Sequence, residues 1–289
     1  MVNHRGAFEF VIAHHNEDLS WLSEVSNDVT VYWKGLPPTG QSQWKETHQL
    51  TNIGRESHTY LHHIVTHYEI LAEVTLFSQG DVHNNGGAMY PHVTVSSAKE
   101  MKQMALASSS IPFMIFTPEV TEFDHWNGIQ WTTSQSTLWW FQQKGRNMAM
   151  AQLTPAEFWT QYLETPHPLT VYYGPGATFS VRATAIRTRP KSFYERLLAV
   201  FIGVNHINPE YGHYMERFWA AIFLDGNRNL QPCDEDDLSN SRTLKILALS
   251  SPQLPFTYEE YANRLMKEKD QKPTVVNGNF YSSGSSRLD

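Results

Sequence analysis

Short apolar runs alternate with amphipathic segments along the first 81 residues of the chain. The runs Phe8–His15, Val29–Trp33 and Val74–Ser78 have the length and the β-branched or aromatic content of buried strands. Leucine and valine recur at helical spacing after Asn16, which is a candidate helix cap, and an apolar stripe runs along Arg55–Leu71. This order predicts an α/β fold with a mixed, mostly parallel sheet flanked by helices.

The rest of the chain carries weaker signals. Further helices are predicted to begin near Ser97, Thr154, Pro190, Pro209 and Thr257, and further strands to span Ile111–Phe116 and Ala177–Ile186. Residues 121–147 hold four tryptophans among polar neighbours and fit no clear pattern. We expect a single α/β catalytic domain over residues 1–270, followed by a flexible polar tail over residues 271–289.

Composition and charge exclude several classes of protein. The 289 residues are 40% hydrophobic and 13% aromatic, which excludes a disordered chain, a collagen and a coiled coil. A net charge of −7 excludes a uniformly basic nucleic-acid coat. The lone cysteine, Cys233, excludes an internal disulfide and fits a reducing compartment. No secretory or membrane-spanning segment is evident, so we expect a cytoplasmic protein without a membrane partner.

Polar residues follow each of the three predicted strands in the first 81 residues. Ligands collect at the carboxyl ends of parallel strands, so these residues are predicted to share one site. The predicted substrate contacts among them are Asn16, Glu17, Gln79, Gly80 and His83. Asp81, at the end of the third strand, can hold a metal ion or orient a hydroxyl or an amine; the alternative is a local turn cap.

The start of the Arg55–Leu71 helix is a second candidate site. Gly54 allows backbone amides to approach a ligand closely, and the helix N-terminus attracts a phosphate or carboxylate. Arg55 would add a bidentate contact to such an anion, with Asn52 beside it. The alternative is an ordinary helix start, in which Glu56 complements the helix dipole and Arg55 lies in solvent.

Two other groups of charges have a functional and a structural interpretation. Glu216 and Arg217 are either an exposed ion pair or a base and an anchor that point into a site. The one basic stretch, residues 180–196, either receives a polyanion or forms a solvated helix face. Its cationic residues are Arg182, Arg187, Arg189, Lys191 and Arg196.

Motifs for covalent, nucleotide or metal chemistry are absent. The chain has no G-x-S-x-G elbow, no Walker loop and no G-x-G-x-x-G fingerprint. Histidines at positions 58 and 62 have a spacing that can ligate zinc, but no His-Glu-x-x-His pattern and no nearby cysteine accompanies them. We therefore expect neither a metal ion nor a cofactor.

Four segments resemble a family found widely in fungi and long filed as a domain of unknown function. They are FEFVIAHHNEDLSWL, NIGRESHTYLHHIVTHYEILAEVTLFSQGD, GPGATFSVRATAIRTRPKSFYERLL and GHYMERFWAAIFLDG, and together they span Phe8 to Gly226. The Asn-x-Gly-Arg-Glu and Gln-Gly-Asp elements are the most specific parts of this resemblance. Members of the family include the arginine-containing cyclodipeptide synthases, which condense arginine and a second amino acid, both delivered as aminoacyl-tRNAs.

The resemblance also implies a fold similar to that of type-A glycosyltransferases. In that fold an aspartate motif after a central strand binds a metal–sugar-nucleotide; Asp81 would lie there, and Glu216 near the acid/base position. Gln79-Gly80-Asp81 lacks the first aspartate of Asp-x-Asp, which puts metal-dependent sugar transfer in doubt. A nucleotide-sugar glycosyltransferase is therefore the second hypothesis, and a small-molecule or carbohydrate binder that stacks ligands on the tryptophans of residues 121–147 is the third.

For a cyclodipeptide synthase, the resemblance and the residues together suggest roles but leave alternatives open. The base that accepts the amine proton would be Glu56, His58 or Glu216, and Asp81, Glu56 or Glu17 would pair with the arginine guanidinium. Amides near Gly54 would stabilise the oxyanion, and Ser57 could carry an acyl group. Arg217 and Trp219 would contact substrate. The partners would be arginyl-tRNA and a second aminoacyl-tRNA, whose backbone would bind the basic stretch.

Overall fold

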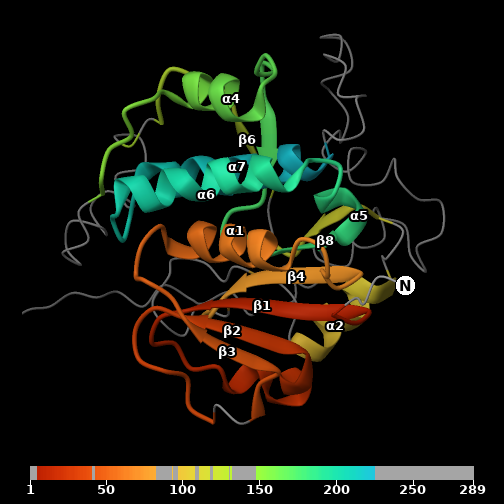
Figure 1. The fold of residues 1–289 in the computed structure, drawn as a ribbon. Coiled ribbons are helices and arrows are strands. Elements are labelled where there is room, and N and C mark those ends of the chain that lie inside the picture. The colour runs from red at the N-terminus through yellow and green to blue at the C-terminus, as the bar shows by residue number, and fades with distance from the viewer. Residues whose placement is uncertain are drawn as a thin grey trace, which may run out of the picture.

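The computed structural model describes residues 5–40, 43–82, 93, 97–107, 111–117, 120–129, 131 and 148–224. Its centre is a six-stranded sheet with the order β3-β2-β1-β4-β8-β5 (Figure 1). These strands are β1 (Phe8–His14), β2 (Val29–Trp33), β3 (Glu46–Gln49), β4 (Val74–Gln79), β5 (Phe113–Ile115) and β8 (Phe179–Arg182). Strands β3, β2, β1 and β4 are mutually parallel, whereas β8 runs antiparallel to both β4 and β5. The predicted α/β fold with a mixed, mostly parallel sheet is confirmed.

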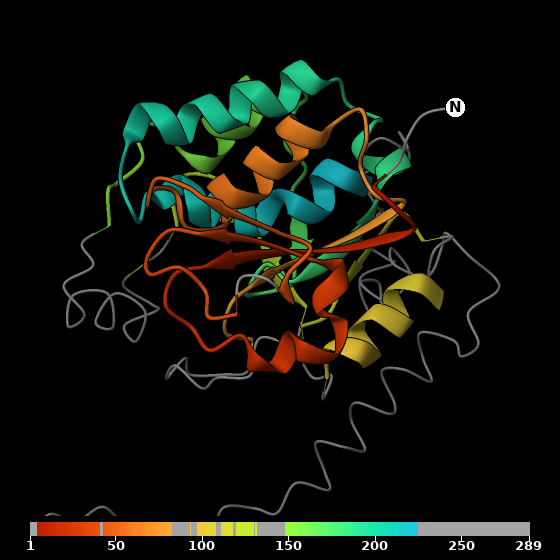
Figure 2. The same cartoon turned by 60° about the horizontal axis from the view of Figure 1, so that its bottom comes forward.

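Helices cover both faces of this sheet (Figures 1 and 2). On one side α1 (Arg55–His67) packs on β1 and against α6 (Lys191–Val204) and α7 (Glu210–Leu224). On the other side the 3-10 helix η1 (Ser20–Asp28) packs against α2 (Ala98–Ala107). A two-stranded sheet of β6 (Thr121–Phe123) and β7 (Val171–Tyr173) contacts α7, and α4 (Pro155–Leu163) and the short α5 (Ala183–Ile186) complete the described elements.

The alternation of side chains along the strands creates two separate hydrophobic cores. Phe10 and Ile12 of β1 join the core beneath η1 and α2, whereas Val11 joins the core beneath α1, α6 and α7. All three side chains are fully buried, as expected for a central parallel strand covered on both faces. Among the described residues, no helix combines the length and the apolar character that crossing a membrane requires.

Several predicted elements differ from those observed. The segment after Asn16 is a 3-10 helix that begins at Ser20 without a side-chain cap, because the Asn16 amide oxygen instead accepts a hydrogen bond from the Leu36 amide. The predicted strand Ala177–Ile186 divides into β8 and α5. The sequence interpretation missed β3, a polar edge strand of four residues. The helix predicted from Thr257 and the tail over residues 271–289 lie outside the described residues.

A buried ionic cluster joins the N-terminal segment to the sheet and α1. The Glu9 side chain is fully buried beneath α1 and accepts hydrogen bonds from Arg5, at 2.9 Å, and from the Thr30 hydroxyl, at 2.6 Å. The Lys45 amine lies 3.4 Å from the same carboxylate, and His63 Nε2 of α1 lies 3.8 Å from it. A buried carboxylate is tolerated only when such partners compensate its lost hydration.

A sharp turn at the start of α1 fixes the position of that helix. Gly54 and Arg55 both have left-handed backbone, with φ values of +64° and +48°. The Gly54 and Arg55 amides donate hydrogen bonds to the carbonyls of His206 and Ile207, at 2.8 and 3.3 Å. This turn therefore ties the start of α1 to the loop between α6 and α7.

Replacing Glu9 with glutamine should destabilise the fold. The substitution would leave the part-buried Arg5 and Lys45 charges without their shared carboxylate, although Arg5 keeps its ion pair with Glu46, so we expect the free energy of unfolding to fall by about 1–3 kcal/mol. Urea denaturation followed by circular dichroism measures this change. Glu24→Gln, at an exposed position of η1, is the matched control and should change stability by less than about 0.5 kcal/mol. Equal stability of the two variants would contradict a structural role for the cluster.

Gly54→Ala should be costly because the left-handed turn leaves no room for a side chain. A Cβ atom at this position would lie 2.6 Å from Phe201 Cδ1 on α6 and 2.7 Å from His58 Cβ. Backbone strain and overpacking together should lower the free energy of unfolding by about 2–4 kcal/mol. In Gly203→Ala, the control on α6, the new Cβ would meet no atom within 4 Å. That variant should gain up to about 1 kcal/mol in the same denaturation experiment, and a loss in both would contradict the steric argument.

Candidate functional site

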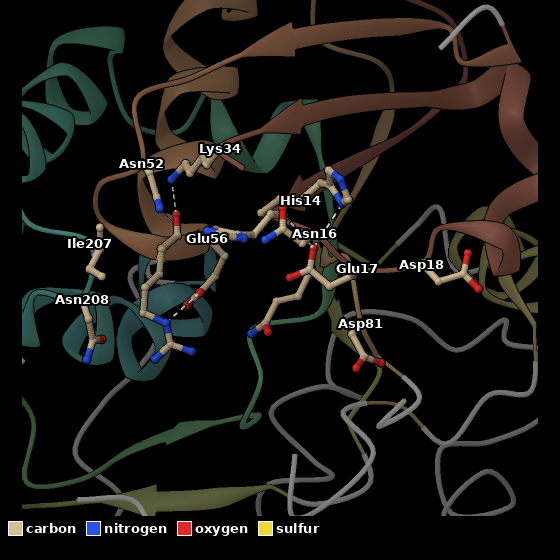
Figure 3. Close-up of a pocket in the computed structure, with 14 residues that line it drawn as sticks. His14, Asn16, Glu17, Asp18, Lys34, Asn52, Glu56, Asp81, Ile207 and Asn208 are labelled. Carbon is tan, nitrogen blue, oxygen red and sulfur yellow. Dashed lines mark hydrogen bonds and ion pairs between the residues drawn. The ribbon is translucent and has the colours of Figure 1, made fainter. Parts of the chain in front are cut away.

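A pocket of about 490 Å³ opens at the carboxyl ends of β1, β2 and β4 (Figure 3). The strand ends contribute residues 13–18, Lys34, Gln79 and Asp81 to its lining. The start of α1 contributes Asn52, Arg55 and Glu56, and the loop before α7 contributes Ile207 and Asn208. The pocket thus lies where a parallel sheet is expected to bind its ligand.

The structure brings together most of the substrate contacts predicted from the strand ends and the start of α1. The predicted residues that line the pocket are Asn16, Glu17, Asn52, Arg55, Glu56, Gln79 and Asp81. They converge because the polar residues follow adjacent parallel strands, and because Ala13 of β1 pairs with Gln79 of β4. His83 lies outside the described residues.

Glu17 is the best-positioned carboxylate in the pocket. Its Oε2 atom accepts hydrogen bonds from the His15 and Asn16 amides, at 2.6 and 3.2 Å, and lies 3.1 Å from His14 Nδ1. Burial raises the pKa of Glu17, but the hydrogen bonds from His14 and from backbone amides outweigh it and hold the pKa below its ordinary value. Oε1 takes no hydrogen bond from the described residues, so an ionised oxygen remains for a ligand.

Gly80 and Asp81 continue β4 into the pocket beside Glu17. The Gly80 amide donates to the Ala13 carbonyl at 3.0 Å, and the Gly80 carbonyl accepts from Trp21 Nε1 at 2.9 Å. A Cβ atom on residue 80 would lie 2.7 Å from Glu17 Oε2, so a larger residue would displace the Glu17 carboxylate from its present position. Gly80 therefore acts through its backbone by placing Asp81 and Glu17 on the same side of the pocket.

The start of α1 is organised differently from the predicted anion site. The amides of Gly54 and Arg55 already donate to backbone carbonyls of the α6–α7 loop, so they are not available to a ligand or an oxyanion. The Arg55 guanidinium lies at the pocket wall, where Nε is 3.5 Å from Glu56 Oε2 and Nη1 is 3.4 Å from His213 Nε2. Arg55 and Glu56 thus enter the pocket as a paired cation and anion.

Lys34 is a pocket residue that the sequence interpretation did not select. Its amine donates to the Ile53 carbonyl at 2.6 Å and to the Arg55 carbonyl. Burial lowers the pKa of Lys34 to about 7, although the nearby Glu56 carboxylate raises it. The only sequence signal was a lysine directly after a buried strand, and that signal did not distinguish Lys34 from a solvent-exposed lysine.

Besides Gly54 and Gly80, four predicted site residues that the structure describes do not line the pocket. His58 is buried, and its pKa is lowered to about 3 by burial and by the charges of Lys34 and His62. Glu216 accepts a hydrogen bond from the Gly176 amide at 2.6 Å. Arg217 donates to the His213 carbonyl and lies over the Tyr173 ring. Trp219 is only 1% exposed and packs in the core, so its predicted contact with substrate is wrong.

The basic stretch lies at the opposite end of the sheet from the pocket. Arg182 is paired with Val74, the first residue of β4, and Arg187 donates to the carbonyls of Tyr68 and Glu69 just beyond α1. Arg189 donates to the Ile222 carbonyl. The two remaining cations pair with carboxylates: Lys191 with Glu195, and Arg196 with Glu164. These contacts support the structural interpretation of the stretch.

Other side chains that the sequence suggested for chemistry or ligand stacking are engaged in contacts within the protein itself. Ser57 is fully buried and donates to the Gly212 carbonyl, so it does not present a nucleophile to the pocket. Trp126 is stacked on His167 and Phe218 in the core, and Trp131 donates to Glu210. Across the described ranges, no three His, Cys, Asp or Glu side chains are grouped so that they could hold a metal ion.

Comparison with known proteins adds the family but no activity. No curated protein and no solved structure matches the chain. One family model, described as "Protein of unknown function (DUF3431)", matches residues 10–238. This span holds all of the pocket-lining residues and nearly all of the described fold. The chain therefore belongs to the DUF3431 family.

Proposed function

We propose that this protein is an aminoacyl-tRNA-dependent enzyme that makes an arginine-containing cyclic dipeptide. The observation that carries the proposal is Glu17, an ionised carboxylate fixed in the pocket with one oxygen open to a ligand. An arginine guanidinium pairs with such an oxygen through strong, charge-assisted hydrogen bonds. The family resemblance of the Asn52–Glu56 and Gln79–Asp81 segments supports the same choice of substrate.

The sequence left three carboxylates as alternative partners for the arginine guanidinium, and the pocket geometry favours two of them. Glu56 already faces Arg55 and is only 7% exposed, whereas Glu17 has an open oxygen, and Asp81 lines the same pocket (Figure 3). We therefore assign the guanidinium subsite to Glu17 and Asp81. Gln79 borders this subsite, and its orientation is fixed by a hydrogen bond from its side-chain amide to the Gly176 carbonyl.

The reaction needs little beyond alignment of its two substrates. The ester of an aminoacyl-tRNA is already activated, and an α-amine with a pKa of ~7.7–8.0 is partly uncharged at neutral pH. Holding amine and ester in contact can supply ~7–11 kcal/mol of the barrier. A polar pocket that holds one aminoacyl group through its side chain is suited to this task.

A type-A-like glycosyltransferase that uses a nucleotide sugar is the alternative. Asp81 favours it, because this carboxylate follows the central strand β4 and lines the pocket. The two proposals differ in donor, so a melting assay with nucleotide sugars and Mn²⁺, and another with tRNA, separates them.

A reconstituted reaction tests the proposed function directly. It would contain the purified protein, ATP, total tRNA, aminoacyl-tRNA synthetases and all twenty amino acids, with and without ribonuclease. Mass spectrometry should detect an arginine-containing cyclic dipeptide that ribonuclease abolishes, and its mass identifies the second amino acid. Absence of this product, with the tRNAs shown to be charged, would reject the proposal.

Glu17→Gln should selectively reduce use of arginine. It keeps the shape of the side chain but removes the charge that pairs with the guanidinium, which is worth about 1.5–3 kcal/mol. The rate of dipeptide formation should fall by roughly 10–150-fold at low arginyl-tRNA concentration, as measured by product mass spectrometry. Glu195→Gln, at an exposed position of α6, is the control and should keep the full rate. Equal rates for both variants would contradict the guanidinium subsite.

A further inference from the structure

The Lys34 amine occupies an unusual position between β2 and the start of α1. Lys34 directly follows β2, lines the pocket, and donates to the carbonyls of Ile53 and Arg55. These two carbonyls accept two of its N–H bonds. A tetrahedral nitrogen then keeps one further position, which is an N–H when the amine is charged and a lone pair when it is not. The same two hydrogen bonds therefore hold the nitrogen in both protonation states.

The charged groups around Lys34 come from several elements. From α1, Glu56 acts on the amine, and the Lys34 charge in turn acts on His58 and His62. Arg55 contributes its carbonyl and carries its own cation at the pocket wall. The end of β1 contributes His14 and Glu17, and the end of β4 contributes Asp81, to the same pocket. Lys34 is thus the one lysine among the described residues that line this pocket.

We propose that the Lys34 amine is the proton acceptor and donor of dipeptide formation in this pocket. The proposal rests on the proposed function and deepens it, because the sequence left the base open among Glu56, His58 and Glu216. Two of these, His58 and Glu216, do not line the pocket. The third, Glu56, already faces the Arg55 guanidinium.

The Lys34 amine alone can carry out both proton transfers that the formation of one peptide bond requires. The α-amine of one aminoacyl group attacks the ester carbon of the other and forms the C–N bond, and the attacking nitrogen then passes a proton to uncharged Lys34. The C–O bond to the tRNA ribose breaks, and Lys34 returns that proton to the departing ribose oxygen. The products are an amide and a free tRNA hydroxyl, and Lys34 is again uncharged. A second cycle closes the ring.

The electrostatics of Lys34 agree with this role. Burial lowers its pKa to about 7, so a large share of the amine is uncharged at neutral pH. A general base is most effective when its pKa is near the working pH. Lys34 can therefore accept and return a proton without a large energetic cost in either direction.

Titration of Lys34 by NMR tests the amine without requiring activity. The wild-type protein would carry lysine labelled with ¹³C at Cε, and the Lys34 resonance would be assigned as the one missing from Lys34→Arg. We expect its midpoint near pH 7, whereas Lys191 on the surface of α6 serves as the internal reference. A midpoint near the ordinary lysine value of ~10.4 would overturn the proposal. Because the free protein is measured, this result does not depend on finding the substrate.

The rate of dipeptide formation in the reconstituted reaction tests the proton transfer itself. Lys34→Arg keeps donors for both carbonyls but cannot deprotonate, and Lys34→Met removes the amine; each should lower the rate by roughly 10²–10⁴-fold. The wild-type rate should rise with an apparent midpoint near pH 7, ahead of the rise that the substrate α-amine causes at its own pKa of ~7.7–8.0, and both variants should lose the first rise and keep the second. Lys102→Met, which removes a surface ion pair with Asp28, is the control and should keep both rate and pH profile.

The outcomes separate the two proposals. If the wild type forms product but Lys34→Arg keeps the full rate, or Lys34 titrates as an ordinary lysine, the role of Lys34 is wrong and the proposed function stands. If the wild type forms no product from verified charged tRNAs, the proposed function fails and the proton cycle fails with it. If Lys34→Met does not fold, Lys34→Arg and the titration of the wild type still decide the question.

Discussion

The left-handed turn at Gly54 and Arg55 is the constraint on which the site depends. It directs the chain from β3 into α1 so that Arg55 and Glu56 reach the ends of the strands. Left-handed backbone at a residue other than glycine costs roughly 1–3 kcal/mol, and here the surrounding hydrogen bonds offset that cost. Lys34 holds the carbonyls of the turn, and the α6–α7 loop holds its amides. Hydrogen bonds therefore join the turn, the Lys34 amine and the α6–α7 loop into one connected network.

Burial acts on the two key ionisable groups in opposite ways because their partners differ. Glu17 keeps its charge, since backbone amides and His14 replace the water that it loses. Lys34 is shifted toward its uncharged form, since its partners are two neutral carbonyls and the attraction of Glu56 does not restore the lost hydration. One pocket thus holds an anion suited to bind a cation and an amine suited to exchange a proton.

Much of the site could be predicted from the sequence because its residues follow adjacent strands. The apolar runs of β1, β2 and β4 predict parallel strands, and Glu17 and Asp81 follow two of these strands, so both residues lie at the carboxyl ends of the sheet. Lys34 could not be singled out, since its burial depends on the turn at Gly54. Asn208 was missed because a distant loop brings it to the pocket. Trp219 was misplaced because the sequence shows that α7 is amphipathic but not what covers each face.

The position of the α6–α7 loop in the sequence also determines when the pocket can form during translation. The strand ends and the start of α1 lie within the first 81 residues, but the carbonyls that accept the Gly54 and Arg55 amides belong to residues 206 and 207. Translation at ~5–20 residues per second separates these two events by on the order of ten seconds. Until the loop leaves the ribosome, the turn lacks two of the hydrogen bonds that hold it. The N-terminal third of the chain can therefore form its strands early, but the pocket is completed only when α6 and the loop arrive.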